Sequence, residues 1–397
     1  TLEAYARTPE PLTIDGIHPN DRGDREISRI IDESLFGAHP ARDPRALARL
    51  QQAVADAAKV GSTLWLSYIF LLFFLLVAVG SVNHRDLLLA SPVALPFLSV
   101  NLPLVAFFSI GPALFLVAHA YVLLHFVLLA DKVGAFHRQL LAQVSRGETR
   151  EQIRRQLPSD IFAQSLAGPR DIREGTIGFM LKMIGWISLV AGPLILLVLF
   201  QLQFLAYHDW AVTWWHRLAV VIDLVLLWRL WPSIAVGAIT APSFAFFRRA
   251  RGAVLASLVP LIFVFTVATY PGEWLNGLPS IRFIPWKCGA AAPSTSISVH
   301  DLLIGGVCDP RVVAAVWPNR LLLVNFDRPA PSGARVGQEV QVPVRLDLSS
   351  RNLQGMVMIG GNLRRANLTA ANLRGANLIE VDLQEAVLIT AKLAGAS

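Results

Sequence analysis

Four ionisable side chains stand inside long apolar segments of this 397-residue chain. They are His119 and His125 in one segment and Asp223 and Arg229 in another. Ionisable groups at membrane depth are costly, and those that occur often carry protons or ions, so a polar path through a membrane is one hypothesis. The plainer hypothesis, which we prefer, is that they bond neighbouring helices or extend towards the membrane surface.

Helix geometry limits which of these groups can meet. Asp223 and Arg229 are six positions apart, which is roughly 120° around a helix, so they do not face each other directly. A bond from a histidine of the first segment to Asp223 is the more plausible contact.

The sequence contains no motif of a familiar enzyme chemistry. The patterns G-x-S-x-G and H-E-x-x-H, a phosphate-binding loop and a dinucleotide fingerprint are all missing. His208, Asp209 and His216 cluster, but no further carboxylates or thiols stand at metal-ligand spacing, and an interfacial polar loop explains them better. We predict no catalytic residue, no metal and no cofactor.

The two cysteines, Cys288 and Cys308, both follow the last apolar segment. A disulfide between them would close a loop of about twenty residues and contribute about 3 kcal/mol in the chain-entropy model. This pairing requires an oxidising compartment, which the charge distribution described below predicts. The alternative is two unrelated thiols.

The composition explains what surrounds these groups. Apolar residues make up 54% of the chain and charged residues only 16%, and the mean hydropathy is +0.51. A chain so apolar and poor in charge is typical of a membrane protein. The first residue is Thr and no apolar signal core follows it, so we expect a trimmed or partial start.

Five apolar segments are expected to cross the hydrocarbon layer, which is roughly 30 Å thick. A Gly-Pro pair predicts a bend in the second segment at Gly111-Pro112, and another stands at Gly192-Pro193 in the third. Leu87 to Val100 is short and holds two prolines, so we interpret it as interfacial or re-entrant. The expected spans are residues 64–79, 102–130, 177–207, 218–239 and 253–270.

Positive charges orient these spans. Lys and Arg gather before the first span, between the second and third, and at Arg248 to Arg251 between the fourth and fifth, whereas the other side keeps only Arg85 and Arg217 in its short loops. Cytoplasmic loops carry the excess of Lys and Arg. We therefore expect a cytoplasmic N-terminus and a C-terminal third on the other side; binding of lipid headgroups or nucleic acid by the basic loops is the alternative.

The chain divides into four parts. Residues 1–60 form a cytoplasmic segment with a helix that starts after Asp43 and leads into the first span, and residues 61–270 form the transmembrane domain. Residues 271–344 are a Pro- and Gly-rich extramembrane connector with a few short strands. Residues 345–397 carry a repeat.

The repeat has a period of five, which is neither the 3.6 of a helix nor the 2 of a strand. Its central apolar residue recurs without insertion from Leu348 to Leu393, and a small residue usually stands two places earlier, as in "ANLTAANLRGANL". A small and a large apolar residue in each unit suit a coil with one short side per unit and an apolar interior.

This pattern resembles the pentapeptide-repeat family, written A(D/N)LXX, and the apolar front end is similar to bacterial membrane-bound members of it. The resemblance implies a right-handed quadrilateral β-helix in which residues twenty apart stack, as Leu348 on Leu368. The units "RLDLS" and "MVMIG" depart from the motif. The last turn would present an open edge that a partner, a second copy or further chain must cap.

Some family members mimic DNA through an acidic column, but this repeat carries a net positive charge, so we predict neither mimicry nor a nucleic-acid partner. The sequence instead predicts a five-span protein of the bacterial inner membrane that presents a periplasmic β-helix as a docking surface. The surface would include Arg364, Arg365 and Arg374, and would meet an acidic protein or glycan or a second copy. The alternative function is a transporter or channel component with His119, Asp223 and Arg229 along a polar path.

Overall fold

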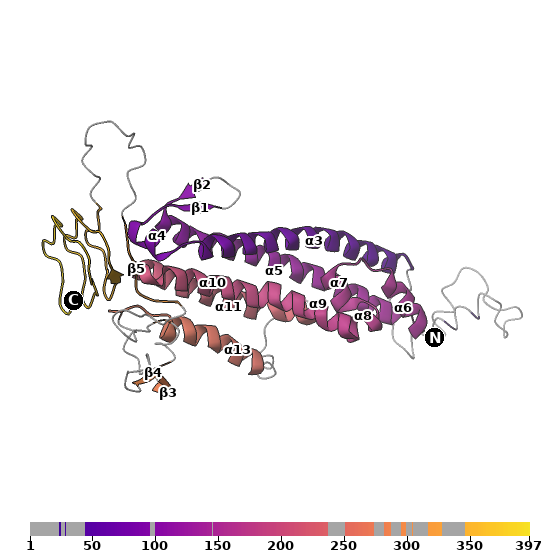
Figure 1. Cartoon of the computed structure of the whole chain (residues 1–397). Coiled ribbons are helices and arrows are strands. Elements are labelled where there is room, and N and C mark those ends of the chain that lie inside the picture. Colours follow the sequence, from indigo (N-terminus) through magenta and orange to yellow (C-terminus); the bar gives the residue numbers. More distant parts are fainter. Residues whose placement is uncertain are drawn as a thin grey trace, which may run out of the picture.

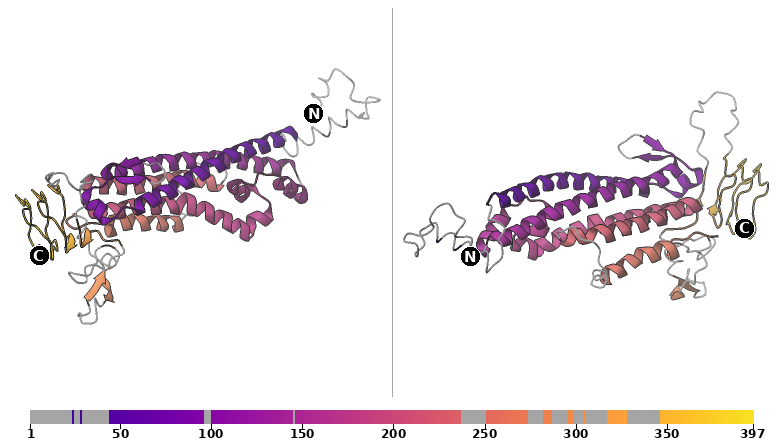
Figure 2. Two further views of the ribbon diagram at one scale, coloured as in Figure 1. Left: turned by 45° about the horizontal axis from the view of Figure 1, so that its top comes forward. Right: turned by 180° about the vertical axis from the view of Figure 1, so that it is seen from behind.

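The structure is a computed structural model of the whole chain. It describes residues 44–95, 100–144, 146–236, 251–273, 317–327 and 346–397, with residues 24, 28, 282–286, 295–298 and 304. Long helices lie side by side in a bundle, and a coil of short strands sits at one of its ends (Figure 1). The first long helix begins at the opposite end of the bundle, and two further views show the same arrangement (Figure 2).

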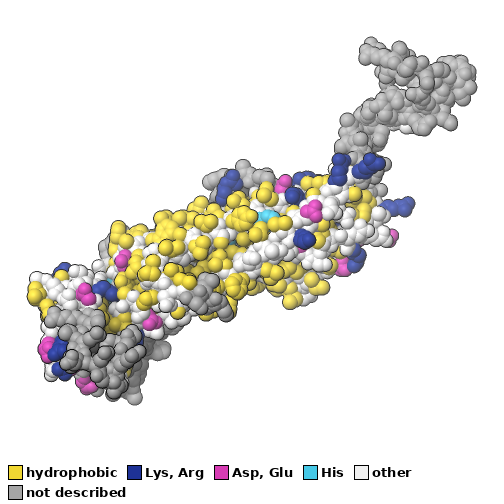
Figure 3. All heavy atoms as spheres, turned by 90° about the horizontal axis from the view of Figure 1, so that it is seen from above, with side chains coloured by type: hydrophobic (Ala, Val, Ile, Leu, Met, Phe, Trp, Pro, Cys, Tyr) yellow, Lys and Arg dark blue, Asp and Glu magenta, His cyan; other side chains and the backbone are white. Residues whose placement is uncertain are grey.

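Among the described residues, four helical segments of the bundle are long and apolar enough to cross a membrane. Their large apolar side chains cover the middle of the molecule, while charged side chains gather towards the ends (Figure 3). This distribution indicates an integral membrane protein. The segments are α3 (Pro44–Gly80), α5 (Leu104–Gln143), the run of α9 (Thr176–Trp186), π-helix η1 (Ile187–Ala191), α10 (Gly192–Phe204) and 3₁₀-helix η2 (Leu205–Tyr207), and finally α11 (Trp210–Val236).

The expected fifth span is a shorter helix. The apolar part of α13 (Arg251–Ile262) and π-helix η3 (Phe263–Val267) runs from Val254 to Val267. The two elements comprise 12 and 5 residues, roughly 25 Å of helix in all. Buried bonds attach their last turns to the coil end of α10 and α11, through Gln201 and Arg217.

The helix expected to lead into the first span is present, and it continues into that span as α3. The start of the fourth span differs from the sequence prediction. The fourth span begins at Trp210 rather than Leu218, so Arg217 lies inside α11 and is fully buried, and its assignment to a short loop was wrong. Residues 87–100 contribute to a short helix and a hairpin at the coil end of the bundle, α4 (His84–Leu89) and β1 (Val93–Leu95) paired with β2 (Val100–Leu102).

Glycine permits close contact between two of the spans. Gly111, followed by Pro112, lies within α5, which continues through both residues. A Cβ atom on Gly111 would lie 2.8 Å from the ring of Phe200 on α10. Such a contact is too short, so the missing side chain allows the two helices to approach.

The end of the bundle opposite the coil is closed by three short helices. They are α6 (Gly147–Arg155), α7 (Ile161–Ala167) and α8 (Arg170–Glu174). Asp160 caps α7 by accepting from the N–H groups of Phe162 and Ala163. Arg154 is buried and donates to the carbonyl of Ala167 at 2.9 Å, so α6 and α7 are held together.

The C-terminal coil has four five-residue units per turn, as the resemblance to the pentapeptide-repeat family implied. Parallel bridges join residues twenty apart, such as Asp347 with Asn367 and Asn367 with Val387. Leu348, Leu353 and Leu368 are at most 1% exposed and fill the interior. Where the second residue of the motif is Asn or Asp, it closes the corner, because its side-chain oxygen accepts the N–H two positions on, as Asn367 does from Thr369.

A strand from the connector covers the first turn of the coil. β5 (Leu322–Val324) pairs in parallel with β6 (Val357–Ile359), which lies in the "MVMIG" unit. Met356 and Met358 are buried there, and a Cβ on Gly361 would collide with the side chain of Met358. The unit departs from the motif because larger sulfur-containing side chains fill the interior where the connector strand docks.

Several predicted features lie outside the described residues. These are Cys288 and Cys308 with their proposed disulfide, Arg248 and Arg249, the segment before residue 44 apart from two residues, and most of the connector. Within the connector the structure describes a hairpin, β3 (Arg282–Trp286) with β4 (Thr295–Ser298).

Candidate functional site

The pair His119 and Asp223 joins two spans at the centre of the bundle. Nδ1 of His119 lies 2.6 Å from Oδ1 of Asp223, and both side chains are completely buried. Nε2 of His119 lies 3.1 Å from the carbonyl oxygen of Leu189 on the third span. The structure thus brings together two of the four intramembrane residues, in the contact between spans that helix geometry favoured.

The backbone of the third span explains why carbonyl groups face this pair. The N–H of Gly192 donates to the carbonyl of Ile187, five residues back, instead of to Ser188. Pro193 has no N–H with which to reach Leu189. The free carbonyls of Ser188 and Leu189 then accept from Tyr68 on α3, at 3.2 Å, and from His119. Such π-helical turns occur frequently at functional sites.

The other two predicted intramembrane residues lie elsewhere. Nε2 of His125 lies 3.3 Å from the carbonyl of Ala57, so it bonds α5 to α3. Arg229 is exposed on α11 and borders a shallow apolar hollow with Trp228, and none of its contacts in the described part of the chain includes His119 or Asp223. A polar path through all three of His119, Asp223 and Arg229 therefore has no support from their placement.

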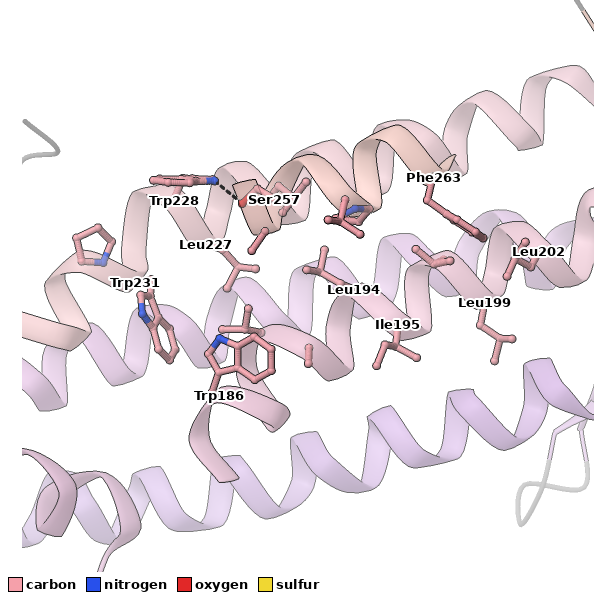
Figure 4. A pocket seen from close by; sticks show the side chains of 18 of the residues that line it. Trp186, Leu194, Ile195, Leu199, Leu202, Leu227, Trp228, Trp231, Ser257 and Phe263 are labelled. Atoms are coloured by element: carbon pink, nitrogen blue, oxygen red, sulfur yellow. Dashed lines mark hydrogen bonds between the residues drawn. The ribbon is translucent and has the colours of Figure 1, made fainter. Parts of the chain in front are cut away.

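An apolar groove of about 650 Å³ lies between α10, α11 and α13. Leu194, Leu227 and Trp231 point into it, and a hydrogen bond of 3.0 Å between Trp228 and Ser257 crosses beside it (Figure 4). The volume is that of a typical small-molecule pocket, but its lining is almost entirely hydrocarbon. Its chemistry suits an apolar chain within a bilayer, not an ionic or polar substrate.

The coil is mounted directly on the end of the bundle. The guanidinium of Arg351 stacks on the ring of Tyr207 at 4.0 Å and donates to the carbonyls of Leu87 and Leu88 at 3.1 and 3.4 Å. Burial lowers the pKa of Arg351 from its ordinary value. A cation buried against another domain in this way fixes the position of that domain.

His208 makes a second contact between the coil and the bundle. We call Arg351 and His208, with the groups of the bundle and the connector that they contact, the mount. His208 lies between α10 and α11, with Nε2 2.7 Å from the carbonyl of Asn319 and Nδ1 3.1 Å from the carbonyl of Asn352. Burial lowers its pKa to about 4, against the opposite effect of the two carbonyls. As a neutral ring it can donate to only one of these carbonyls, and it packs against the other, so it brings the bundle, the connector and the coil into contact.

A buried ion pair holds the last bundle helix at the same end. Nη1 and Nη2 of Arg217 both contact the carboxylate of Glu273. The Nε of Arg217 donates to the carbonyl of Val264 at 2.9 Å. The guanidinium lies 5.0 Å from the ring of Trp214. The sequence analysis missed this site because Arg217 precedes the most apolar part of its segment.

The three predicted surface arginines of the coil differ in their surroundings. Arg365 forms two hydrogen bonds with Glu385 of the next turn, at 2.6 and 3.4 Å, and Arg364 lies 3.6 Å from Asp382. Arg374 is exposed, and no carboxylate pairs with it among the described residues. Acidic groups of the coil itself therefore balance two of the three charges that the sequence assigned to a partner.

A comparison with protein families identifies the coil. The model of pentapeptide repeats matches residues 347–384 and 362–397, with eight copies. Residues 347–397 are pentapeptide repeats. Neither curated proteins nor solved structures give a match to this chain. The membrane bundle and the mount must therefore be interpreted from their own residues.

The described residues contain no group of three or more His, Cys, Asp and Glu side chains that could hold a metal ion. Their polar contacts lie instead at the helix bundle centre, at the mount and along the pentapeptide-repeat coil.

Proposed function

We propose that this protein is a membrane-anchored docking protein that holds a pentapeptide-repeat coil in a fixed orientation at one membrane face. The observation that carries the proposal is the mount, in which Arg351 of the first coil turn donates to carbonyls of the bundle and His208 packs against the carbonyl of Asn352. A flexible tether would be enough to keep a domain near a membrane. A bonded mount adds a defined height and direction, which is useful to a partner that also has a fixed position.

The partner is a protein that binds the later turns of the coil. The first turn contacts the bundle and β5, whereas Thr369, Arg374 and Gln384 stand on later turns. The outer surface there mixes paired charges with uncharged residues, as a non-obligate protein interface does. Catalysis, a cofactor and a nucleic-acid partner have no place in this proposal.

The charge distribution supports an orientation. Basic side chains gather at the bundle end opposite the coil, in and around α6 and α8 and at the start of α3. The excess of Lys and Arg marks the cytoplasmic side, so the coil would stand in the periplasm of a bacterial inner membrane. This topology needs α13 and η3 as a fifth crossing, and their attachment near Arg217, at the coil end, supports it.

A crosslinking experiment in intact cells tests the docking proposal. A photoreactive amino acid is placed at Thr369, Arg374 or Gln384, and at Leu124 on the apolar surface of α5 as the matched control. We expect one discrete crosslinked protein from at least one coil position and none from Leu124, with loss of the product when the coil face is changed by Arg374→Glu. Absence of any product from all three coil positions would refute the docking function.

Sidedness is tested separately with a membrane-impermeant thiol reagent. The variant Thr369→Cys, with Cys288 and Cys308 replaced by Ser, should be labelled in intact cells if the coil is periplasmic. Labelling only after lysis would place the coil in the cytoplasm and, because Arg351 holds the coil on the bundle end opposite the start of α3, would require the inverse orientation of the spans.

A further inference from the structure

The buried pair His119–Asp223 requires a proton that its surroundings define. The carbonyl oxygen of Leu189 can only accept a hydrogen bond, so Nε2 of His119, 3.1 Å away, must carry hydrogen. The second ring nitrogen, Nδ1, lies 2.6 Å from Oδ1 of Asp223. Two lone pairs would repel at this distance, so a hydrogen must also lie between these two atoms.

This count leaves two arrangements of the protons. Either an imidazolium faces a carboxylate, or a neutral imidazole accepts a hydrogen bond from a carboxylic acid. Both have a net charge of zero and hold one proton more than a neutral histidine beside an ionised aspartate. A net negative charge at this depth would be strongly disfavoured, because both side chains are completely buried.

The groups around the pair support this neutral state. The ring of His119 stacks against Tyr68 and Phe115, with centroids 5.6 and 5.9 Å away, and no cation is among its contacts in the described part of the chain. Tyr68 is the titratable neighbour from α3, and its hydroxyl donates to the carbonyl of Ser188. The third span contributes only backbone carbonyls and the hydroxyl of Ser188. Oδ2 of Asp223 has no hydrogen-bond partner within the described residues, an arrangement that suits an acid better than a carboxylate.

We propose that His119 and Asp223 form an intramembrane proton-binding site whose bound proton keeps α5 bonded to both α11 and the π-helical turn η1. Binding takes one proton from the aqueous phase and places it between Nδ1 and Oδ1, and release returns it to the aqueous phase. Without it, either the bond to Asp223 or the bond to Leu189 is lost. Proton occupancy therefore controls how the second, third and fourth spans pack, and this inference does not depend on the docking function.

Polar side chains on one face of α3 indicate the side from which the proton exchanges. Ser62 donates to Asp160 at 3.0 Å near the end of the bundle opposite the coil, and Trp65 donates to Ser188 at 3.1 Å deeper in the bundle. Tyr68 follows one turn later, against His119. The exchange side is thus the end opposite the coil.

The variant Asp223→Asn separates proton binding from helix bonding. An asparagine amide can donate to Nδ1 of a neutral His119, so the hydrogen bond is retained without the additional proton. The test measures the equilibrium unfolding of the full-length protein in detergent micelles from pH 6 to 9. The control is His125→Gln, which removes a histidine of the same helix that is bonded to a carbonyl only.

The direction of the effect follows from the proton count. Above about pH 6.5, the ordinary pKa of histidine, an unfolded chain has a neutral histidine and an ionised aspartate, whereas the folded site holds one proton more. The ratio of folded to unfolded wild type should therefore fall about tenfold per pH unit relative to Asp223→Asn. The His125→Gln variant should keep the slope of the wild type.

Equal pH slopes for the wild type and Asp223→Asn would overturn the proposal. If Asp223→Asn does not fold, the nitrogen NMR spectrum of His119 in the wild type at pH 8, assigned by its loss in His119→Gln, gives the answer. We expect hydrogen on Nε2 and a second hydrogen in the bond to Asp223. A single N–H on His119 beside an ionised Asp223 would refute the site.

Discussion

Replacing Arg351 by Ala should release the pentapeptide-repeat coil from its fixed position on the bundle. Arg351 belongs to the first turn of the coil, and its guanidinium contacts the ring of Tyr207 and the carbonyls of Leu87 and Leu88. The substitution removes all three contacts at once. It leaves the interior of the coil unchanged, because the side chain points to the bundle and not to the stacked leucines.

The size of the effect can be worked out from these contacts. A partly desolvated cation–π contact contributes about 1 to 2 kcal/mol, and each hydrogen bond from a charged donor about 1.5 to 3 kcal/mol. The loss of hydration of a mostly buried guanidinium offsets part of this sum. We expect the coil to be held less firmly by about 2 to 4 kcal/mol, which corresponds to a roughly 30- to 1,000-fold larger detached population.

Distance measurements between two spin labels provide the assay. One label is placed at Ser81, directly after the coil end of α3, and the other at Thr369 on the second turn of the coil, with Cys288 and Cys308 replaced by Ser. The native mount should give a narrow distance distribution, and Arg351→Ala should broaden it. The matched control is Arg374→Ala, which removes an exposed arginine of the same coil and should leave the distribution narrow.

The intermediate substitution Arg351→Lys makes the test more specific. Lysine keeps the charge but not the planar fork, so it should broaden the distribution less than alanine does. An unchanged, narrow distribution for Arg351→Ala would refute the mount as the device that orients the coil. The argument for a docking surface of fixed direction would then lose its main support.

Three further predictions concern stability in detergent micelles, measured by thermal unfolding. Arg217→Ala should destabilise the protein by about 3 to 5 kcal/mol because it leaves the carboxylate of Glu273 buried and unpaired, whereas loss of under 1 kcal/mol would show that the pair is hydrated. Because burial lowers the pKa of His208 to about 4, the unfolded chain takes up a proton that the folded protein does not bind below about pH 6.5. Stability should then fall towards pH 4 by roughly 1.4 kcal/mol per pH unit more in the wild type than in His208→Gln; equal slopes would contradict the assignment. Gly375→Val should cost about 2 kcal/mol and Thr390→Gly should be neutral or stabilising, since both positions have a positive φ, of 62° and 55°. Equal effects of these last two changes would refute the strain argument.

The sequence was sufficient for those parts of the fold that depend on periodicity. A period of five with a small residue before each leucine predicts the coil, and stacking at twenty residues also places Arg365 over Glu385, although the sequence analysis did not draw that consequence. Apolar length likewise predicts the four long spans. In each case the determining contacts are local or repeat at a fixed interval.

The mount and the proton site depend on contacts between residues far apart in the sequence, and no periodic spacing predicts such contacts. Arg351 meets residues more than 260 positions earlier in the chain, and His208 meets Asn352 across 144. Arg217 was misassigned because hydropathy alone cannot show that Glu273, from a segment after the fifth apolar stretch, neutralises it. One signal was available for the proton site: Gly192-Pro193 predicts free carbonyls about four residues earlier, and these are the groups that face His119 and Tyr68.

The distribution of contacts along the coil determines where a partner can bind. The first turn is occupied, since β5 covers the "MVMIG" unit and Arg351 and Asn352 contact the bundle. Ion pairs join the second turn to the first and make it more rigid. Other polar side chains of the second turn, such as Arg374, are outside these pairs and are exposed to a partner. Because the mount fixes the first turn, a partner that binds the second turn is held at one distance from the membrane. The irregular units of the first turn therefore bind the bundle and β5, and the regular units of the second turn are exposed to a partner.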